Sequence, residues 1–317
     1  MKRDIEETIS DQIQIDPSFK TQRCYVRVTS GYISKELILK RGYKAENFCN
    51  KTIDNVLNRL GYTLKKVLKT KPLKKIPETD AIFENVATQH ALAKANPRIL
   101  RISIDVKAKV KVGNLSRGGY SRLLEAPEAE DHDLNWEGSL VPFGINEINT
   151  DNVFLTFGNS AETSDFIVDA LEKWWDDRQF MADDYDMLMI DSDNGKAVAS
   201  NTKRYLDRIV GFSKKIDMPI RLVYYPPYHS KYNPVERVWG ALENYWKPLI
   251  LDSIDNVINV ASKMTWKGMN PIVSFINKVY LKGLSLSPDE VKELNPFIVR
   301  NPLLPKWDVL VLNKLTG

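Results

Sequence analysis

The sequence predicts a mixed α/β protein, with helices flanking a sheet and a small helix-turn-helix or winged-helix-like domain in front. Three observations support this fold class. Apolar and polar residues alternate from Leu100 to Val112, which is typical of strands. Short apolar runs at 187–190 and 220–225 indicate buried strands with helix-forming segments around them. The first 77 residues are basic and contain two short helical patterns.

The composition is that of a globular protein. Apolar residues make up 43% and charged residues 27% of the 317 residues, which excludes wholesale disorder. No run approaches the ~18–20 apolar residues of a membrane span, and the N-terminus lacks the apolar core of a signal peptide. The two cysteines, Cys24 and Cys49, are too few for a disulfide framework or a four-thiolate zinc site. We therefore expect a cytoplasmic protein without a membrane partner.

Charge is distributed unevenly along the chain. Residues 1–77 hold 17 Lys and Arg against 8 Asp and Glu, whereas the remaining residues hold 28 against 33. This asymmetry indicates either a polyanion-binding module joined to a body that uses carboxylates, or only a solvated lysine-rich surface.

The front end, residues 1–76, has the pattern of a helix-turn-helix with a wing. One helix is expected after Ser34 and ends at Gly42, and a second begins near Asn50 and ends at Gly61. The alternative is a helical hairpin that only packs on the rest of the chain. Amides and a guanidinium on the second helix suit base edges, and the lysines that follow suit phosphates. The candidate DNA contacts are Lys51, Asn55, Asn58, Arg59, Lys65, Lys66 and Lys69.

A helical connector is expected over 77–96, and the α/β body follows over 97–250. The alternation at 100–112 predicts a hairpin that turns near 107–109, and further strands are expected at 139–146 and 152–157. Helices are expected over about 160–180, over roughly 200–216 and after Asn233-Pro234. Residues 251–317, helical at first and then irregular, are expected to extend this body.

Three acids stand out by their placement. Asp105 lies within a strand, where a carboxylate is disfavoured unless something requires it. Asp193 follows the buried strand 187–190, at the carboxyl end where α/β sheets form their sites. Glu236 lies in the first turn of the helix that Pro234 opens, where it would also favour the helix dipole. Three oxygen ligands without a His or Cys cluster suit Mg²⁺ or Mn²⁺.

These residues belong to segments that resemble a known family. PPYHSKYNPVERVW, at 226–239, resembles the block around the last catalytic acid of mariner-related DDE transposases. IDSDNG is similar to the turn around their second aspartate. ISIDVKAKVKVGNLSRGG resembles the first-aspartate strand of the Rhodopirellula-type transposase family within that group. The resemblance covers about 97–290, and the Asn-Pro-apolar-Glu string is its most specific part.

The resemblance implies an RNase H-like catalytic domain in which Asp105, Asp193 and Glu236 bind two divalent ions, Mg²⁺ or Mn²⁺. The ions would activate water, and later a DNA 3′-hydroxyl, for in-line attack on phosphodiesters. The implied protein is a bacterial insertion-sequence transposase that cuts and joins DNA. Its partners would be the terminal inverted repeats of the element and target DNA, on which it would assemble as a homodimer, in the cytoplasm at the nucleoid.

The second acid has a competitor in Asp191, which falls on the same side of the strand by parity. We choose Asp193 because Asn194 follows it, as in the mariner-like turn, and because it lies further out of the sheet. The rival functions are a catalytically inactive or truncated transposase-derived DNA-binding protein, and an RNase H-like nuclease. The intact acids favour the transposase.

The expected geometry is that the carboxyl groups of the three acids converge on one pocket within about 8 Å of each other. Basic side chains should line its mouth, with Lys107, Arg117 and Lys231 as candidates, and Arg117 and Lys231 as DNA contacts. Asn194 is a possible accessory residue. His229 either assists proton transfer or phosphate binding, or makes only a local hydrogen bond. Tyrosines near Glu236 either stack on unpaired bases or pack on the core; they are Tyr224, Tyr225, Tyr228 and Tyr232.

Overall fold

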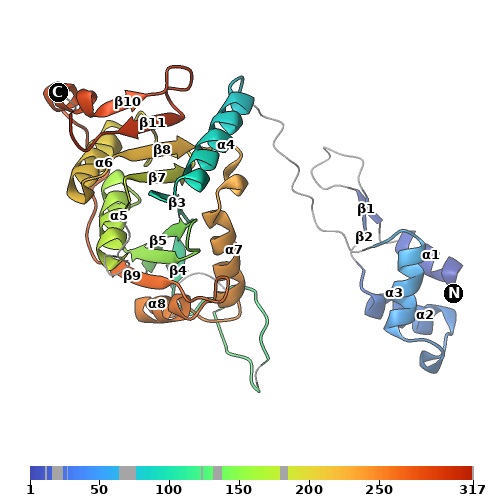
Figure 1. Cartoon of the computed structure of the whole chain (residues 1–317). Helices are drawn as coiled ribbons and strands as arrows, with labels where there is room; N and C mark the ends of the chain where they lie inside the picture. Colours follow the sequence, from blue (N-terminus) through green and yellow to red (C-terminus); the bar gives the residue numbers. More distant parts are fainter. Residues whose placement is uncertain are drawn as a thin grey trace. The chain divides into compact units, whose positions relative to one another are not determined.

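The chain divides into two compact units, residues 1–71 and 72–317 (Figure 1). The structure is a computed structural model that describes residues 1–10, 13–15, 24–26, 28–63, 76–122, 124–130, 138–178 and 185–315. Each unit has its own apolar core, so each is described by itself.

The described residues of the N-terminal unit form three helices. They are α1 (Lys2–Ser10), α2 (Ser30–Arg41) and α3 (Asn50–Arg59), with a short two-stranded sheet, β1 (Ile13–Ile15) and β2 (Cys24–Val26), and a 3-10 turn, η1 (Ala45–Asn47). The helices meet through five buried aliphatic side chains: Ile5, Ile9, Ile33, Leu37 and Ile53. Helix α1 and the β1–β2 pair were not anticipated from the sequence.

The helix boundaries in this unit follow local capping. Helix α2 begins earlier than the predicted start at Ser34, because the Thr29 hydroxyl accepts a hydrogen bond from the backbone N–H of Tyr32 and caps the helix there. Gly42 ends α2 in the left-handed conformation (φ 69°), as its lack of a Cβ allows. Helix α3 begins at the predicted position. The predicted wing, with Lys65, Lys66 and Lys69, lies outside the described residues.

The described residues of the main unit form a nine-stranded mixed sheet with flanking helices. Its order is β10-β11-β8-β7-β3-β5-β6-β9, and β4 pairs with β5. The strands are β3 (Ile99–Val106), β4 (Val110–Val112), β5 (Gly138–Glu147), β6 (Val153–Gly158), β7 (Met187–Ser192), β8 (Ile220–Tyr224), β9 (Ile272–Ile276), β10 (Ile298–Arg300) and β11 (Asp308–Val311). The helices are α4 (Thr79–Ala95), α5 (Ser164–Arg178), α6 (Lys203–Ile216), α7 (Val235–Trp246), α8 (Ile254–Ser262) and α9 (Pro288–Leu294), with 3-10 turns η2 (Ser230–Tyr232) and η3 (Asn295–Phe297). The expected mixed α/β class with flanking helices is confirmed.

The predicted hairpin turning near 107–109 is wrong. Strands β3 and β4 both pair with β5 and run in the same direction along it. Strand β5 is ten residues long, so it can serve both partners, and the Lys107 N–H still donates to the Pro142 carbonyl between them. The alternation from 100 to 112 therefore comes from two strands that pair one after the other along β5. A period of two indicates an extended backbone, but it does not show which strand is its partner.

The C-terminal segment is more regular than predicted. Strand β9 pairs parallel with β6, and β10 and β11 extend the sheet beyond β8. These strands are only three to five residues long, which leaves a weak pattern in the sequence.

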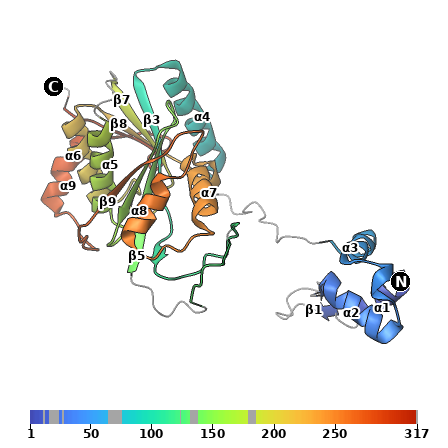
Figure 2. The ribbon, with the colours of Figure 1, turned by 90° about the horizontal axis from the view of Figure 1, so that it is seen from below.

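Helices cover both faces of the sheet (Figure 2). The core on one face joins even-numbered residues of β3, such as Ile102 and Ile104, to α5 and α6. On the other face, α4 packs near Ile99 and Met189, while α7 and α8 pack on β4, β5 and β6. No described helix combines the length and apolar character needed to span a bilayer.

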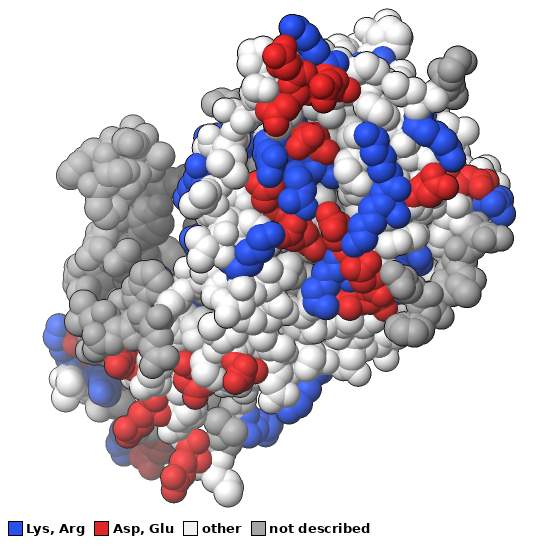
Figure 3. All heavy atoms as spheres, turned by 90° about the vertical axis from the view of Figure 1, so that its left-hand side faces the viewer, with Lys and Arg blue, Asp and Glu red and all other residues white. Residues whose placement is uncertain are grey.

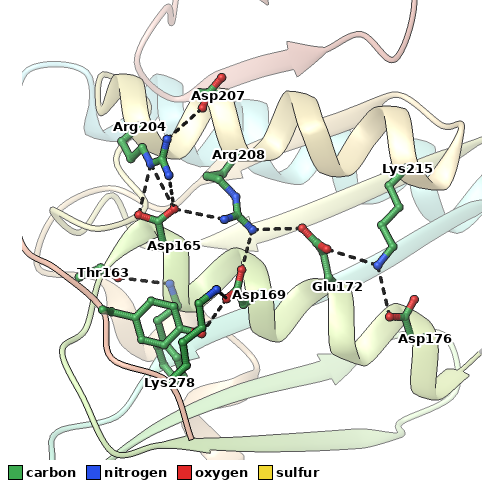
Figure 4. Close-up of polar contacts among 12 residues, drawn as sticks. Thr163, Asp165, Asp169, Glu172, Asp176, Arg204, Asp207, Arg208, Lys215 and Lys278 are labelled. Atoms are coloured by element: carbon green, nitrogen blue, oxygen red, sulfur yellow. Dashed lines mark hydrogen bonds and ion pairs between the residues drawn. The ribbon is translucent and has the colours of Figure 1, made fainter. Parts of the chain in front are cut away.

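Helices α5 and α6 are joined by a ladder of ion pairs. Acidic and basic side chains alternate over this face of the unit (Figure 3). Arg208 of α6 contacts three carboxylates of α5, reaching Asp165 at 3.2 Å, Asp169 at 2.6 Å and Glu172 at 3.1 Å (Figure 4). Lys215 continues the ladder at its more exposed end (Figure 4). The carboxylates of this ladder are therefore paired with basic residues of α6.

We expect Arg208→Gln to lower the free energy of unfolding by about 1–3 kcal/mol, because three partly buried carboxylates lose a shared partner. Lys215→Gln, at the exposed end, should cost less than about 1 kcal/mol. Urea unfolding at low and high salt measures both. Equal losses for the two variants would contradict the role of burial in this ladder.

Candidate active site

Parallel pairing of β3 with β7 brings two of the predicted acids to one edge of the sheet. The last pairs in this ladder are Ile102 with Ile190 and Ser103 with Asp191. Continuing that register by two residues places Asp105, near the end of β3, level with Asp193, the first residue after β7. Asp105 and Asp193 therefore come from the ends of neighbouring strands.

Helix α7 brings the third acid to the same face as Asp105. Pro234 precedes the helix, and Glu236 lies in its first turn. Trp239, one turn after Glu236, donates a hydrogen bond from its indole Nε1 to Asp105 Oδ2 at 2.8 Å. The first turn of α7 is therefore held close to Asp105.

The electrostatics of Asp105 reflect this crowding. Burial and then the nearby charge of Glu236 raise the pKa of Asp105 to about 7, and the charge of Asp193 adds to the effect. The hydrogen bond from Trp239 opposes the rise. The three acids thus interact electrostatically, and the repulsion disfavours the charged form of Asp105.

A small cavity of about 70 Å³ lies between Asp105 and Asp193. Its lining includes both acids and Ser192, but not Glu236. Among the described residues, no three His, Cys, Asp or Glu side chains lie together as a ready-made metal site. The convergence of all three acids on one pocket is met for Asp105 and Asp193, and the three-acid site stays a prediction.

The donor set nevertheless fits a divalent cation. It consists of carboxylates, the hard oxygen ligands that Mg²⁺ and Mn²⁺ prefer. The raised pKa of Asp105 shows that negative charge is unfavourable here, so a cation would relieve the repulsion among the acids.

Asp191 has a different environment from Asp193. It is fully buried, and its Oδ2 accepts hydrogen bonds from Arg101 Nε at 2.8 Å and Nη2 at 2.6 Å. His90 Nε2 of α4 lies 3.0 Å from the same oxygen, and the Tyr225 hydroxyl lies 3.5 Å away. Asp191 is thus committed to a polar cluster beneath α4, which favours Asp193 as the second acid.

A fourth carboxylate, Glu162, was missed by the sequence reasoning. It lines the cavity with Asp105 and Asp193, from the loop between β6 and α5. Burial and the charge of Asp193 raise the pKa of Glu162, while Lys109 and Lys282 counteract the rise. A lone acid in a loop gives no signal in the sequence, so only the fold places it here.

The basic residues expected at the pocket mouth are engaged elsewhere. Lys107 Nζ lies 2.7 Å from Glu243 Oε1, and Arg117 Nη2 lies 3.5 Å from the same oxygen. Arg117 also lies over the ring of Trp246. Lys231 is exposed and lies near the ring of Tyr232. The pairing with Glu243 weakens the interpretation of Lys107 and Arg117 as free phosphate contacts.

The accessory residues have local partners. Asn194 accepts a hydrogen bond from Ser200 N at 3.1 Å and donates one to Lys306 O at 3.3 Å, so it holds the turn after β7. His229 Nδ1 lies 2.7 Å from the Pro227 carbonyl, and its ring contacts Phe83 of α4. These contacts favour the local role for His229.

Of the four tyrosines, two are exposed and two are core residues. Tyr228 and Tyr232 are exposed, so stacking on a base remains open to them, whereas Tyr224 and Tyr225 are buried.

On helix α3 of the N-terminal unit, all four candidate DNA contacts are exposed: Lys51, Asn55, Asn58 and Arg59.

The class of protein follows from a match to a known family. The chain matches the family described as Rhodopirellula transposase DDE domain over residues 4–313, nearly its whole length. It belongs to this transposase family. No curated protein matches the sequence.

The solved structures that the chain matches include transposase and integrase structures. The Mos1 transposase paired-end complex with left transposon end is 10% identical, with a TM-score of 0.45 over 81% of this chain and 68% of that chain. The mariner Mos1 paired-end complex with Mg is 10% identical, with a TM-score of 0.44 over 79% and 76%. The HTLV-2 integrase catalytic core domain in complex with magnesium is 13% identical, with a TM-score of 0.29 over 54% and 90%.

The raised pKa of Asp105 predicts how stability depends on pH without metal. In the unfolded chain this carboxyl has a pKa of about 3.9, so between about pH 4 and 7 the folded state keeps a proton that the unfolded state has lost. The contribution of Asp105 to stability therefore falls as pH rises through this window and levels off above it.

We expect wild type to lose about 2–3 kcal/mol relative to Asp105→Asn between pH 5 and 8. Urea unfolding of both proteins in EDTA measures this difference, and other titrating groups cancel in the comparison. Added Mg²⁺ at pH 8 should restore wild type but not the variant. A difference that is independent of pH would contradict the assigned environment of Asp105.

Proposed function

We propose that this protein is an insertion-sequence transposase that binds the ends of its element and catalyses metal-dependent DNA strand cleavage and strand transfer. The observation that supports it most is the electrostatic coupling of Asp105 with Glu236 and Asp193, three acids that are 88 and 43 positions apart in the sequence. Family membership supplies the class of reaction, and the acids supply the site.

The proposed catalytic body is an RNase H-like domain over 97–250, with residues 251–317 as its extension. Its support is the central strand order β6-β5-β3-β7-β8, in which β3, β7 and β8 run parallel and β5 runs antiparallel to its neighbours. Asp105 and Asp193 lie at the carboxyl ends of β3 and β7, the edge where α/β sheets form their sites.

The proposed cofactor is Mg²⁺ or Mn²⁺, as two ions held by Asp105, Asp193 and Glu236. When bound, such ions supply Lewis-acid activation for attack on a phosphodiester. Asp105 must lose its proton before it can act as a ligand, so at neutral pH metal and proton compete for it. Trp239 orients one oxygen of Asp105 through its indole N–H.

The N-terminal unit is proposed to bind the terminal inverted repeats through α3, as a helix-turn-helix-like domain. The support is a helix with an apolar buried face around Ile53 and an exposed face of amide and basic groups. Residues 77–96 then act as a connector, and target DNA and a second copy on the DNA are further proposed partners. The protein would work where the chromosome is, at the nucleoid.

For the catalytic acids, we expect Asp105→Asn, Asp193→Asn and Glu236→Gln each to abolish Mg²⁺-dependent nicking of an element end. End binding in a gel shift should remain within about twofold, because the acids hold metal and the N-terminal unit holds DNA. Asp176→Asn, which removes a carboxylate from the distant ladder on α5, is the matched control and should cut normally.

Asp191→Asn should act through stability, because it removes a charge that Arg101 needs in a buried site. Normal cutting by Asp193→Asn together with a folded but inactive Asp191→Asn would overturn the assignment of the second acid. If wild type bound element ends and never cut them, the inactive DNA-binding relic would be the better account.

For the DNA-binding unit, we expect Arg59→Ala and Asn55→Ala to reduce discrimination between element-end and random DNA by about 1–3 kcal/mol, because both side chains suit base edges. Lys44→Ala, which removes an exposed charge outside α3, should change binding to both DNAs alike. Titrations at several salt concentrations should give a log–log slope of about −0.9 per neutralised phosphate. Salt-independent binding would refute the proposal.

A further inference from the structure

Hydrogen bonds tie both sides of Glu236 to strand β3. Asn233 lies three residues before Glu236, and Trp239 lies three residues after it, so all three positions fall along one side of the start of α7. Each of the two flanking side chains bonds to a residue of β3 at or next to Asp105. None of these bonds is needed to form the helix itself.

The first connection runs through Asn233 and Ser103, which are both fully buried polar residues. Ser103 Oγ donates to Asn233 Oδ1 at 2.5 Å and accepts from the backbone N–H of Val235 at 3.0 Å. Asn233 Nδ2 donates to the Ile104 carbonyl at 2.8 Å, one residue beyond the last β3–β7 pair. The Asn233 backbone carbonyl in turn accepts from the N–H of Glu236 at 3.1 Å.

The second connection is the bond from Trp239 Nε1 to Asp105 Oδ2. Its indole is 4% exposed and lies against Gly144, which is paired with Asp105 across β3 and β5. A Cβ at Gly144 would lie 2.6 Å from Cζ2 of the indole, so any larger residue there would displace the ring. Glycine thus leaves the space that lets this donor reach the carboxylate.

We propose that Ser103, Asn233 and Trp239, together called the β3–α7 clamp, are positioning residues that fix Glu236 relative to Asp105. This inference rests on the proposed function, because it concerns the same two carboxylates as metal ligands. Two negatively charged groups repel each other, so without bonds on both sides of Glu236 the first turn of α7 would relax away from β3. The clamp holds the pair at a set distance before any cation arrives.

Packing alone does not account for the clamp. The apolar residues Val235, Val238 and Leu242 already bury one side of α7 against the sheet. Buried polar side chains between a helix and a strand cost free energy unless every partner is met, and here Asn233 meets a hydroxyl and a carbonyl. Their placement beside Asp105 and Glu236, rather than elsewhere along α7, points to positioning of the acids.

The test measures Mn²⁺ binding to the full chain without DNA, so its readout is independent of cutting. Removing partners that orient metal ligands typically weakens metal affinity 10–100-fold. We expect Trp239→Phe to weaken Mn²⁺ binding at least tenfold while end binding in a gel shift stays unchanged. Trp266→Phe is the matched control, because it removes an indole whose Nε1 has no hydrogen-bond partner among the described residues.

A second pair of variants separates the hydrogen bond from the packing. Gly144→Ala should weaken Mn²⁺ binding as much as Trp239→Phe, because the indole is pushed from Asp105. The double variant Gly144→Ala/Trp239→Phe removes the clash with the indole, since phenylalanine lacks those ring atoms, and leaves the new Cβ 3.2 Å from Cγ2 of Val235. It should still bind Mn²⁺ at least tenfold more weakly than wild type.

The outcomes distinguish the clamp from the proposed function. If wild type binds Mn²⁺ in a manner that Asp105→Asn abolishes, and Trp239→Phe binds it within twofold of wild type, the clamp is refuted while the proposed function stands. Wild-type affinity in the double variant would also refute it, because packing would then suffice. If wild type shows no Mn²⁺ binding that depends on Asp105, both proposals fail together.

Discussion

Repulsion among carboxylates at the end of β3 is the constraint on which the site depends. Burial and the charge of Glu236 raise the pKa of Asp105 to about 7, so the fold holds these groups together against their own preference. Parallel pairing fixes Asp105 and Asp193 on neighbouring strands, and α7 is bonded to β3 on both sides of Glu236. The ends of two paired strands and the first turn of a helix thus hold in place carboxylates that repel each other.

Acidic residues within the sheet have a different role from those beyond the ends of its strands. Asp191 is buried with Arg101 and lies below α4, where its charge is met by the protein itself. Asp193, two residues later, has left the strand and lines a cavity, and its Oδ1 accepts a local hydrogen bond from Gly195 N. An acid whose charge is balanced internally stabilises the fold, whereas one at a cavity keeps its charge for a ligand. The strand end at Ser192 is what separates them.

Much of the body could be predicted from the sequence, because its strands are apolar runs and its helices carry clear start signals. The apolar run at 187–190 and the Asn-Pro before α7 place Asp193 and Glu236 without coordinates. Pairing partners could not be predicted, so the β3–β4 hairpin was wrong, since alternation does not show which strand lies beside another. The contacts that individual side chains make could not be predicted from the sequence either. Lys107 meets Glu243, and Glu162 reaches the cavity, only because distant segments are folded together.

The spacing of the Asn-Pro-Val-Glu string has a physical explanation in this fold. Pro234 caps the start of α7, so Asn233 lies just before the helix, where its side chain bonds to β3. Three residues later the chain has made almost one turn, which returns Glu236 to the side of the helix that faces β3, and Trp239 follows one turn further on. A helix-breaking residue, an anchoring amide and an acid must therefore stand in this order and at this spacing. The motif therefore sets the position of Glu236 relative to Asp105 as well as supplying the acid itself.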